Sequence, residues 1–430
     1  MLTKEMNELL TRTGPGTPAG EMARRYWHPV ALSEEMPEGG APMPVRIFGE
    51  DLVLFRDEQG RLGLLDKRCP HRCTDLTYGR IEDGGLRCLY HGWLFDVKGN
   101  CLEQPAEPEN STYKDEIKHT AYAVHEEGGM IFAYMGPLTD GGEPPKFPEY
   151  EFLKVPPEHR FIRRSVIDCN YLQSLEGEYD PAHLSFLHRP LEKKDTRPVP
   201  GAEAGMSADM YYKADGRPNL DYEATDYGVR IFSVRKSGED KKYVRVTNFV
   251  APNSAAIVGN EGRIGEGYSM HWHVAIDDTH HTRFDYAFNR VRPLDQAKYL
   301  ERFGNDAGPD GVTRRRPENR YFQDRQLMKT SNFTGMGESF NVHDAFATES
   351  QGAVEDRTRE HLGTTDVIIA RVRRLLTEAI EAVKDGKDPV GVRRENGDVS
   401  SIIVLSEVMP NAVDHKDYVR TKTFRSQAAE

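Results

Sequence analysis

The chain has 430 residues, of which 37% are hydrophobic and 29% are charged, a composition typical of globular proteins with two or three domains. Its formal net charge of -12 argues against nucleic acid as a partner, and basic runs such as residues 314–316 are too local to reverse that balance. The sequence contains no apolar run long enough to span a membrane, and its first twenty residues lack the apolar stretch of a signal peptide. We therefore expect a cytoplasmic protein that binds neither nucleic acid nor membrane.

The first third of the chain predicts a short helix and then a small all-β module. Residues 2–12 carry apolar side chains at helical spacing and stop at Gly14-Pro15-Gly16. From residue 30 to about residue 136, short apolar segments alternate with turns such as residues 57–60 and 97–100.

A stretch rich in Pro and Gly, residues 137–157, marks the expected boundary of a second domain. Beyond it the sequence predicts strands near residues 227–236, 243–252, 268–277 and 282–291, and a strong amphipathic helix over residues 365–384. The predicted fold class is α+β, with an antiparallel sheet flanked by helices. We expect an amino-terminal helical segment (1–24), the β module (25–137) and a larger domain (138–430).

Two short segments of the β module carry a thiolate and an imidazole each. Cys69 and His71 are separated by sixteen residues from Cys88 and His91. Two Cys and two His in this order suit a Rieske [2Fe–2S] cluster, with Cys on one iron and His on the other. Zinc accepts the same ligand types, but its usual spacing pairs two Cys and then two His. The pattern therefore favours the iron–sulfur cluster.

The other three cysteines are too few for a disulfide framework in a chain of this length. Cys73 lies near the first pair, where a bridge between the two loops would need a second cysteine at the position of Tyr90. We therefore expect Cys73 to be a free loop thiol with a structural role.

A second cluster of candidate ligands follows a helix-like run over residues 170–178. Asp180, His183 and His188 form an Asp-x-x-His-x-x-x-x-His pattern, and two imidazoles with one carboxylate can hold a non-haem iron that binds dioxygen. Asp180 before Pro181 predicts the start of a new helix that carries both histidines. A regular helix would turn the two rings about 140° apart, so a π-bulge or a helix end is required. The third ligand is open, with residues 343–350 as a candidate region.

The chain resembles the Rieske non-haem iron oxygenases in its cluster loops, CPHRCTDLTYGRIEDGGLRCLYHGWLFD, and in the later segment EYDPAHLSFLH. Within that family it is similar to the branch of phthalate dioxygenase and the lignin-derived O-demethylases, through NELLTRTGPGTPAGEMARRYWHPV, QDRQLMK and DAFATESQGAVEDRTREHLGTTD. The resemblance covers essentially the whole chain. It implies a Rieske domain followed by a catalytic domain of the helix-grip type.

The resemblance also implies the ligands of both metal centres. These are Cys69, His71, Cys88 and His91 for the [2Fe–2S] cluster, and His183, His188 and Asp344 for a mononuclear Fe(II).

Asp180 would bridge His183 to the cluster ligand His91 of a neighbouring subunit, so the resemblance implies a homotrimer or a dimer of trimers. Asn170 would be a non-ligating neighbour of the iron. Two positions depart from the family pattern: His343 stands where Gln is usual before the carboxylate ligand, and Cys73 stands where a small or basic residue is usual.

By this resemblance the chain is a terminal oxygenase that dihydroxylates an aromatic carboxylate of the phthalate or benzoate type with dioxygen. Electrons would come from a separate NAD(P)H-dependent reductase, since the chain has no dinucleotide-binding glycine motif. Oxidative O-demethylation of a methoxylated aromatic acid is the alternative, and a pure Rieske electron carrier is the alternative of a different class.

A carboxylate substrate needs a cation to bind it, and an arginine offers two parallel hydrogen bonds. Arg245 is the first candidate, followed by Arg230 and Arg217. The histidines at positions 271, 273, 280 and 281 are expected to be structural or exposed, with His271 or His273 as possible pocket residues.

Overall fold

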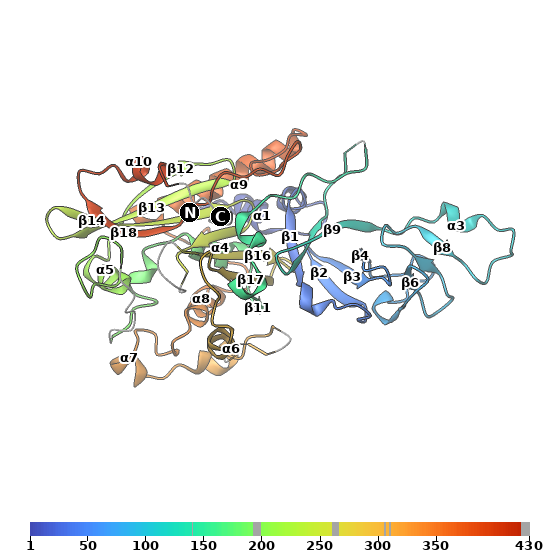
Figure 1. Cartoon of the computed structure of the whole chain (residues 1–430), viewed down its shortest axis with the longest axis horizontal. Coiled ribbons are helices and arrows are strands. Elements are labelled where there is room, and N and C mark those ends of the chain that lie inside the picture. The colour runs from blue at the N-terminus through green and yellow to red at the C-terminus, as the bar shows by residue number, and fades with distance from the viewer. Residues whose placement is uncertain (140, 192–198, 260–265, 305–306, 309–310, 423–430) are drawn as a thin grey trace.

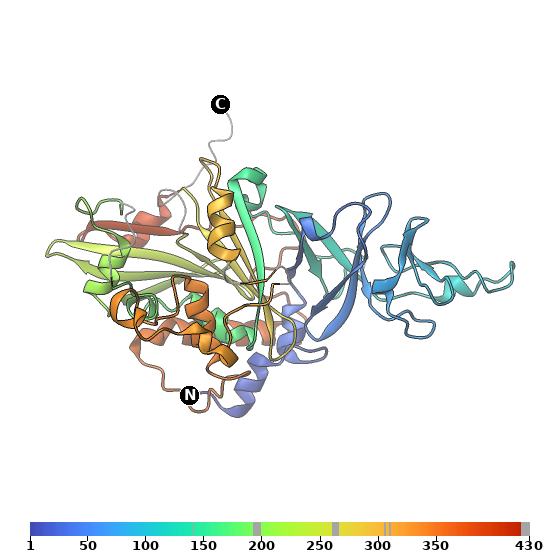
Figure 2. The same ribbon diagram turned by 90° about the horizontal axis from the view of Figure 1, so that it is seen from below.

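The structure is a computed structural model that describes residues 1–139, 141–191, 199–259, 266–304, 307–308 and 311–422. It is elongated, with the small β module at one end of the long axis and the larger domain at the other (Figure 1). A view from below shows the two amino-terminal helices beside the larger domain (Figure 2). No helix in the described ranges is both long and apolar enough to cross a lipid bilayer.

The chain opens with two capped helices that pack against the carboxy-terminal part of the chain. Thr3 caps α1 (Lys4–Thr11) by accepting a hydrogen bond from the backbone N–H of Met6, and Thr17 caps α2 (Pro18–Ala23) in the same way. The apolar faces of both helices contact α9 (Val367–Lys384) and belong to the main hydrophobic core. The helices predicted over residues 2–12 and 365–384 are thus confirmed.

The small module contains two antiparallel sheets, as its alternating sequence predicts. One sheet has the order β1-β10-β9-β4-β3-β2 and the other the order β5-β6-β7-β8. The strands of the first are β1 (Trp27–Leu32), β2 (Met43–Ile47), β3 (Glu50–Arg56), β4 (Leu62–Asp66), β9 (Ala121–Glu127) and β10 (Met130–Tyr134). Those of the second are β5 (Arg80–Glu82), β6 (Gly85–Arg87), β7 (Leu94–Phe95) and β8 (Cys101–Glu103).

The larger domain is built on one antiparallel sheet with the order β11-β17-β16-β15-β14-β13-β12, and β18 pairs with β14. Its strands are β11 (Arg160–Ile167), β12 (Asn219–Ala224), β13 (Gly228–Ser237), β14 (Lys241–Val250), β15 (Ser254–Ile257), β16 (Ser269–Ala275), β17 (His281–Phe288) and β18 (Leu405–Pro410). The four strands predicted from the sequence correspond to β13, β14, β16 and β17. The α+β prediction for this domain is therefore confirmed.

Helices cover this sheet and form the wall of the candidate site. Helix α4 (Tyr171–Glu178) packs against β15, β16 and α8 (Phe340–Glu349), while α9 packs against β12 and β13. The other α-helices are α3 (Tyr113–Glu116), α5 (Ala208–Ala214), α6 (Gln296–Gly304), α7 (Leu327–Thr330) and α10 (His415–Arg420). The 3-10 helices are Ser33–Glu35, Leu76–Tyr78, Glu151–Lys154, Pro157–His159, His183–Ser185, Pro317–Phe322 and Thr364–Asp366.

A buried histidine joins the first strand of the β module to the larger domain. His28 is 1% exposed, its Nε2 donates to the carbonyl of Ala23 at 2.8 Å, and its Nδ1 faces the side-chain amide of Asn253 at 3.4 Å. Burial lowers the pKa of His28 to about 4. The imidazole is therefore neutral in the folded protein at neutral pH.

Because the folded pKa of His28 lies below its unfolded value, its contribution to stability is complete above pH 6.5 and is lost as the pH falls towards 4. We expect His28→Gln, which keeps a donor for Ala23 but does not titrate, to lose less stability than the wild type on acidification. Between pH 7 and pH 5 the difference should be about 2 kcal/mol, measured by chemical denaturation. Identical pH slopes for the two proteins would contradict this account.

Candidate metal centres and cavity

The two segments that carry the candidate cluster ligands have the same backbone design. In the first, the N–H of Cys69 donates to the carbonyl of Thr74, and the N–H of Cys73 donates to the carbonyl of Cys69. In the second, Cys88 bonds to Trp93 and Gly92 bonds to Cys88 in the same register. Residues 69–74 and 88–93, called the cluster loops below, are therefore two matched turns with Cys at equivalent positions, and His follows two residues later in the first and three residues later in the second.

The side chains of the cluster loops converge at the end of the β module. The Cys69 and Cys88 thiols are buried, and the interaction with Cys69 lowers the pKa of Cys88 to about 6. The rings of His71 and His91 lie beside them with centroids 4.4 Å apart, and both are half-buried.

This donor set fits a Rieske cluster. Two buried sulfurs lie on one side of the site and two imidazoles on the solvent side, as a [2Fe–2S] cluster bound by two Cys and two His requires. The Nδ1 atom of His91 is buried and has no hydrogen-bond partner among the described residues, which suits an atom that faces a metal. His71 also stacks on Trp93 at 4.6 Å, so its ring plane is fixed.

All five cysteines are free. Cys73 is exposed and has a φ of 58°, in the left-handed region, and Gly92 has a φ of 75° at the equivalent position of the second cluster loop. Each loop thus needs a residue in the left-handed conformation four positions after its cysteine. This requirement explains the backbone conformation of Cys73, and nothing in the structure explains its thiol.

The second group of candidate ligands begins where α4 ends. The helix predicted to carry both histidines is absent from this part of the described chain: His183–Ser185 is a single 3-10 turn, and His188 lies in the irregular turn that follows. The prediction of a new helix that carries both histidines is wrong, whereas the departure from a regular helix that their spacing requires is observed. Just before this turn the carboxylate of Asp180 accepts from the N–H of Ala182 at 2.8 Å, and the irregular backbone lets both rings face one point.

His183, His188 and Asp344 form a compact group of potential metal ligands, with one donor atom of each within 4.8 Å of the others. His188 Nε2 lies 2.9 Å from Asp344 Oδ1, and His183 Nε2 lies 4.0 Å from the same oxygen. Helix α8 supplies Asp344, while the turn after α4 supplies both histidines. Two imidazoles and a carboxylate on one side suit an iron with open positions.

Each imidazole of this group also contacts a second side chain. His183 Nδ1 lies 3.6 Å from Asp180 Oδ2, and His188 Nδ1 lies 3.3 Å from His343 Nδ1. Burial alone would lower the pKa of His183, but Asp180 and Asp344 outweigh it and raise the pKa. Burial lowers the pKa of His343 to about 4, so this ring is neutral.

A buried ionic network behind the metal group was not identified from the sequence. Glu178, the last residue of α4, accepts hydrogen bonds from His271 at 2.9 Å and His273 at 3.2 Å, and pairs with Arg283 at 3.2 Å. Burial would raise the pKa of Glu178, but His271 and Arg283 hold it well below its usual range. Arg283 also pairs with Asp285 at 2.7 Å. The sequence signal that could have revealed this network is the alternation of charged residues, Arg283 and Asp285, on one face of β17.

The other histidines of this region are structural, as expected, apart from one that reaches the cavity. His273 and His281 are fully buried and contact each other at 3.2 Å, and the half-exposed ring of His280 contacts Asp277. His271 borders the cavity described next.

A cavity of about 1140 Å³ lies over the metal group. Its lining includes all three potential ligands as well as apolar side chains at positions 184, 187, 257, 258 and 340. Apolar walls with a few polar groups are typical of small-molecule sites. The cavity therefore places a bound molecule beside the candidate metal position.

The three candidate arginines differ sharply in their surroundings. Arg245, on β14, lines the cavity, while the described lining includes neither Arg230 nor Arg217. Arg230 pairs with Glu223 at 2.6 Å and donates to the hydroxyl of Tyr227, and Arg217 is exposed. Of the three candidates, the described lining of the cavity thus includes Arg245 alone.

Asn170 lies at the start of α4, whereas the metal group begins after the end of that helix. It caps α4 by accepting from the N–H of Leu172, and its amide nitrogen donates to the carbonyls of Thr11 and Asp278. These three bonds explain its complete burial. These contacts fix the start of α4 against the amino-terminal segment, at the other end of the helix from the turn that carries His183.

Comparison with known proteins agrees with this geometry. A family model described as the Rieske [2Fe-2S] domain matches residues 26–114, and one described as LigXa C-terminal domain like matches residues 133–430. The phthalate 4,5-dioxygenase oxygenase subunit of Pseudomonas putida is 39% identical, over 97% of this chain and 95% of that protein. The 5,5'-dehydrodivanillate O-demethylase oxygenase subunit of Sphingobium sp. is 33% identical, over 97% of this chain and 88% of that protein.

Solved structures share the fold. A chain in the reduced complex between oxygenase and ferredoxin in carbazole 1,9a-dioxygenase superposes with a TM-score of 0.57 at 20% identity, over 90% of this chain and 98% of that one.

The chain belongs to the Rieske non-haem iron oxygenases. Within that family it falls in the branch that includes the oxygenase subunits of phthalate dioxygenase and an O-demethylase. It is accordingly an oxidoreductase whose cofactors are a Rieske [2Fe–2S] cluster and a mononuclear iron. The electron-carrier alternative is overturned, because the match extends over the whole catalytic domain.

We expect the Glu178–Arg283 network to stabilise the larger domain. Glu178→Leu leaves Arg283 buried with one carboxylate partner fewer, so the free energy of unfolding should fall by about 3 kcal/mol in chemical denaturation. Glu318→Gln is the matched control, because that side chain is 77% exposed and should change stability by less than about 0.5 kcal/mol. A Glu178→Leu protein as stable as the wild type would show that the network contributes no net stability.

Proposed function

We propose that this chain is the terminal oxygenase of a multicomponent system that uses dioxygen to dihydroxylate an aromatic carboxylate. The observation that carries the substrate class is Arg245, a buried cation that lines the cavity over the metal group and has no anionic partner among the described residues. The likeness to a phthalate 4,5-dioxygenase oxygenase subunit supports both the aromatic acid and the reaction.

The proposed metal ligands follow the two groups described above. The cluster ligands are Cys69, His71, Cys88 and His91, and the ligands of the mononuclear iron are His183, His188 and Asp344. When bound, the iron supplies the chemistry that activates dioxygen, and the cluster supplies electrons one at a time.

The surroundings of Arg245 favour an anionic substrate. The side chain is 7% exposed, its Nε is buried without a hydrogen-bond partner, and it makes no ion pair within the described part of the chain. A buried guanidinium without a partner is unfavourable unless a ligand compensates it. A carboxylate can do so through two charge-assisted hydrogen bonds. The charge of Arg245 acts to lower the pKa of His183. A carboxylate bound to Arg245 would therefore hold the aromatic ring of the substrate near the metal group.

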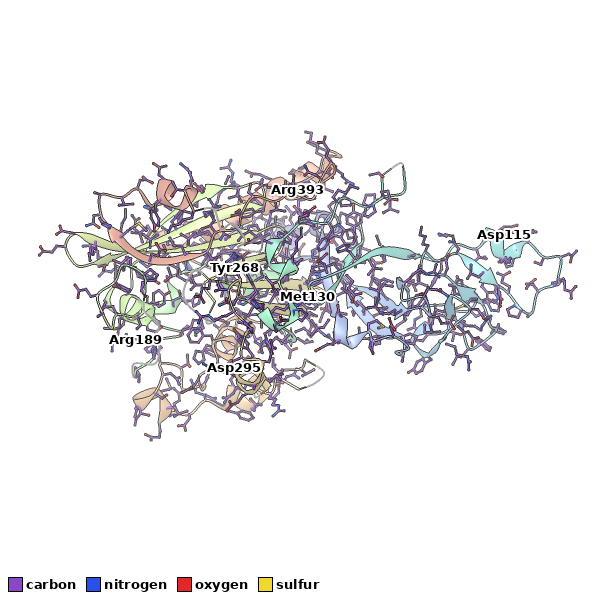
Figure 3. All side chains as sticks on the ribbon, viewed as in Figure 1. Asp115, Met130, Arg189, Tyr268, Asp295 and Arg393 are labelled. Atoms are coloured by element: carbon purple, nitrogen blue, oxygen red, sulfur yellow. The ribbon has the colours of Figure 1, made fainter. Side chains whose placement is uncertain are left out.

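Asp180 is proposed to connect the cluster of one subunit to the iron of the next. Asp115, in the β module, and Arg189, which follows His188, lie at opposite ends of the molecule (Figure 3). The two centres of one chain are thus separated along its long axis. An acceptor on a neighbouring chain, reached through Asp180 and His183, favours a ring of subunits, either a homotrimer or a dimer of trimers.

Electrons are proposed to reach the cluster from a separate NAD(P)H-dependent reductase. The structural similarity to the oxygenase–ferredoxin complex of carbazole 1,9a-dioxygenase supports a separate electron-transfer protein. The half-buried rings of His71 and His91 leave that side of the cluster site within reach of a partner surface.

Oxidative O-demethylation of a methoxylated aromatic acid is the second candidate, because an O-demethylase oxygenase subunit is 33% identical over nearly the whole chain. Arg245 serves both reactions equally, since both substrates carry a carboxylate. The products separate the two: a cis-dihydrodiol retains both oxygen atoms of dioxygen, whereas demethylation releases formaldehyde.

The substrate class can be tested with phthalates, benzoates and methoxybenzoates, supplied with dioxygen and reduced partner protein. We expect a dihydrodiol from a carboxylate substrate, and we expect Arg245→Met to raise the KM for that substrate about 10- to 100-fold, because a charge-assisted contact is lost. Arg217→Gln is the control, since that exposed arginine lies outside the cavity. An unchanged KM in the Arg245→Met enzyme, or equal turnover of the neutral methyl ester, would remove Arg245 from substrate binding.

The route between subunits can be tested with two inactive variants. Cys88→Ser lacks the cluster and His188→Ala lacks the iron, and mixed rings can be isolated from co-expression with two different tags. A mixed trimer holds one competent donor–acceptor pair, so turnover should recover to about one third of the wild type. Asp180→Asn in the iron-bearing subunit should abolish that recovery. Mixed rings that stay inactive, with each remaining metal centre occupied, would refute transfer between subunits.

A further inference from the structure

His188 is held from the side opposite to the metal group by a second histidine. His343 is 2% exposed on α8, and its Nδ1 lies 3.3 Å from His188 Nδ1. The other ring nitrogen of His343, Nε2, lies 3.1 Å from the carbonyl oxygen of Gly337. His188, His343 and Gly337 therefore form a continuous hydrogen-bonded chain that ends on a backbone carbonyl.

The carbonyl end fixes the direction of every bond in this chain. A carbonyl oxygen only accepts, so Nε2 of His343 must carry the hydrogen. In the neutral imidazole Nδ1 of His343 is then an acceptor, and Nδ1 of His188 must donate to it. The Nε2 atom of His188 is left with its lone pair, and it is this atom that lies 2.9 Å from Asp344 Oδ1 in the metal group.

Stacking restrains the same ring. Phe340 lies on His188 with centroids 4.4 Å apart and an interplanar angle of 17°. His343 is nearly parallel to both rings, at 19° to His188 and 24° to Phe340. Rotation of His188 about its side-chain bonds would break the hydrogen bond and the stack together.

The backbone that supplies the carbonyl depends on a glycine. Gly337 has a φ of 85°, and a Cβ at this position would lie 3.2 Å from the guanidinium of Arg315. A side chain here is strained by the backbone conformation, so Gly337 lets the loop before α8 aim its carbonyl at His343.

We propose that His343 is a positioning residue that fixes the tautomer and the plane of His188, and so sets the affinity of the mononuclear site for a divalent metal. The proposal rests on the ligand assignment given under the proposed function. Outer hydrogen-bond partners of metal-bound histidines commonly change metal affinity 10- to 100-fold. His183 has the carboxylate of Asp180 in the corresponding place, so the two imidazole ligands are supported by groups of different charge.

The proposal predicts that an acceptor, rather than bulk, is needed at position 343. Asparagine and leucine have nearly the same shape, but only the amide oxygen of asparagine can accept the hydrogen of His188 Nδ1 at the place of the imidazole Nδ1. The full-length protein, with its [2Fe–2S] cluster intact and its mononuclear site emptied by a chelator, is titrated with Co(II). The Co(II) visible spectrum then reports affinity and ligand geometry without any assay of turnover.

We expect His343→Leu to weaken Co(II) binding about 10- to 100-fold and to alter the Co(II) spectrum, and His343→Asn to stay within about threefold of the wild type. The cluster spectrum and the thermal midpoint report whether each variant is folded. If His343→Leu does not fold, His343→Met against His343→Gln makes the same comparison between a side chain without and with an amide oxygen.

The outcomes distinguish failure of the positioning role of His343 from failure of the ligand assignment on which it rests. Equal affinities in all three proteins, or an equal loss in His343→Leu and His343→Asn, would overturn the positioning role, because the acceptor would then make no difference. Wild-type protein that binds no Co(II), or that binds it as tightly after His188→Ala, would overturn the ligand assignment and the positioning role with it.

Discussion

The packing of α4 between the large sheet and α8 is the constraint on which the catalytic centre depends. Helix α4 contacts β15 and β16 on one side and α8 on another, and Glu178 at its end forms buried contacts with His271, His273 and Arg283 of the sheet. The next residues turn into the metal group, while α8 supplies Asp344. Because buried contacts hold both α4 and α8, the side chains of His183, His188 and Asp344 converge although Asp344 is far from the two histidines in sequence. No regular helix is needed between the two histidines. A buried ion pair by itself is weak evidence of stability, but this one also fixes where α4 stops.

The same arrangement occurs at both candidate metal centres: each candidate ligand contacts a neighbouring residue that is itself fixed by other contacts. In the β module, each cluster loop closes by two backbone hydrogen bonds to its own cysteine, and Trp93 stacks on His71. In the larger domain, the carboxylate of Asp180 lies 3.6 Å from the ring of His183, and α8 carries both Asp344 and His343. Rigid surroundings of this kind keep ligands in place and limit the rearrangement needed at each step of electron transfer.

The sequence predicted the parts of this structure that depend on local chemistry. Ligand types and spacing pointed to Cys69, His71, Cys88 and His91, and the apolar periodicity of residues 365–384 located α9. It failed where tertiary packing decides. Asp180 before Pro181 has the signature of a helix start, yet the chain makes one 3-10 turn, because both rings must face the same point. The roles of Asn170 and Arg230 could not be predicted from sequence. Asn170 contacts Thr11, which is distant along the chain, and Arg230 pairs with Glu223 on the neighbouring strand.

Charge balance around the cavity explains why Arg245 suits an anionic ligand and another buried arginine of the described lining, Arg283, does not. Arg283 is buried, but it pairs with Glu178 and Asp285 and comes within 3.9 Å of Asp344, so the protein already compensates its charge. Arg245 has no such carboxylate within the described chain, although its surroundings are as dry. A bound anion would compensate the charge of Arg245. The charge of Arg283 is already compensated by the protein, so it needs no bound anion. The proposed selection for an acid over its ester therefore rests on the lack of a carboxylate beside Arg245 among the described residues and not on the overall charge of the protein, which is negative.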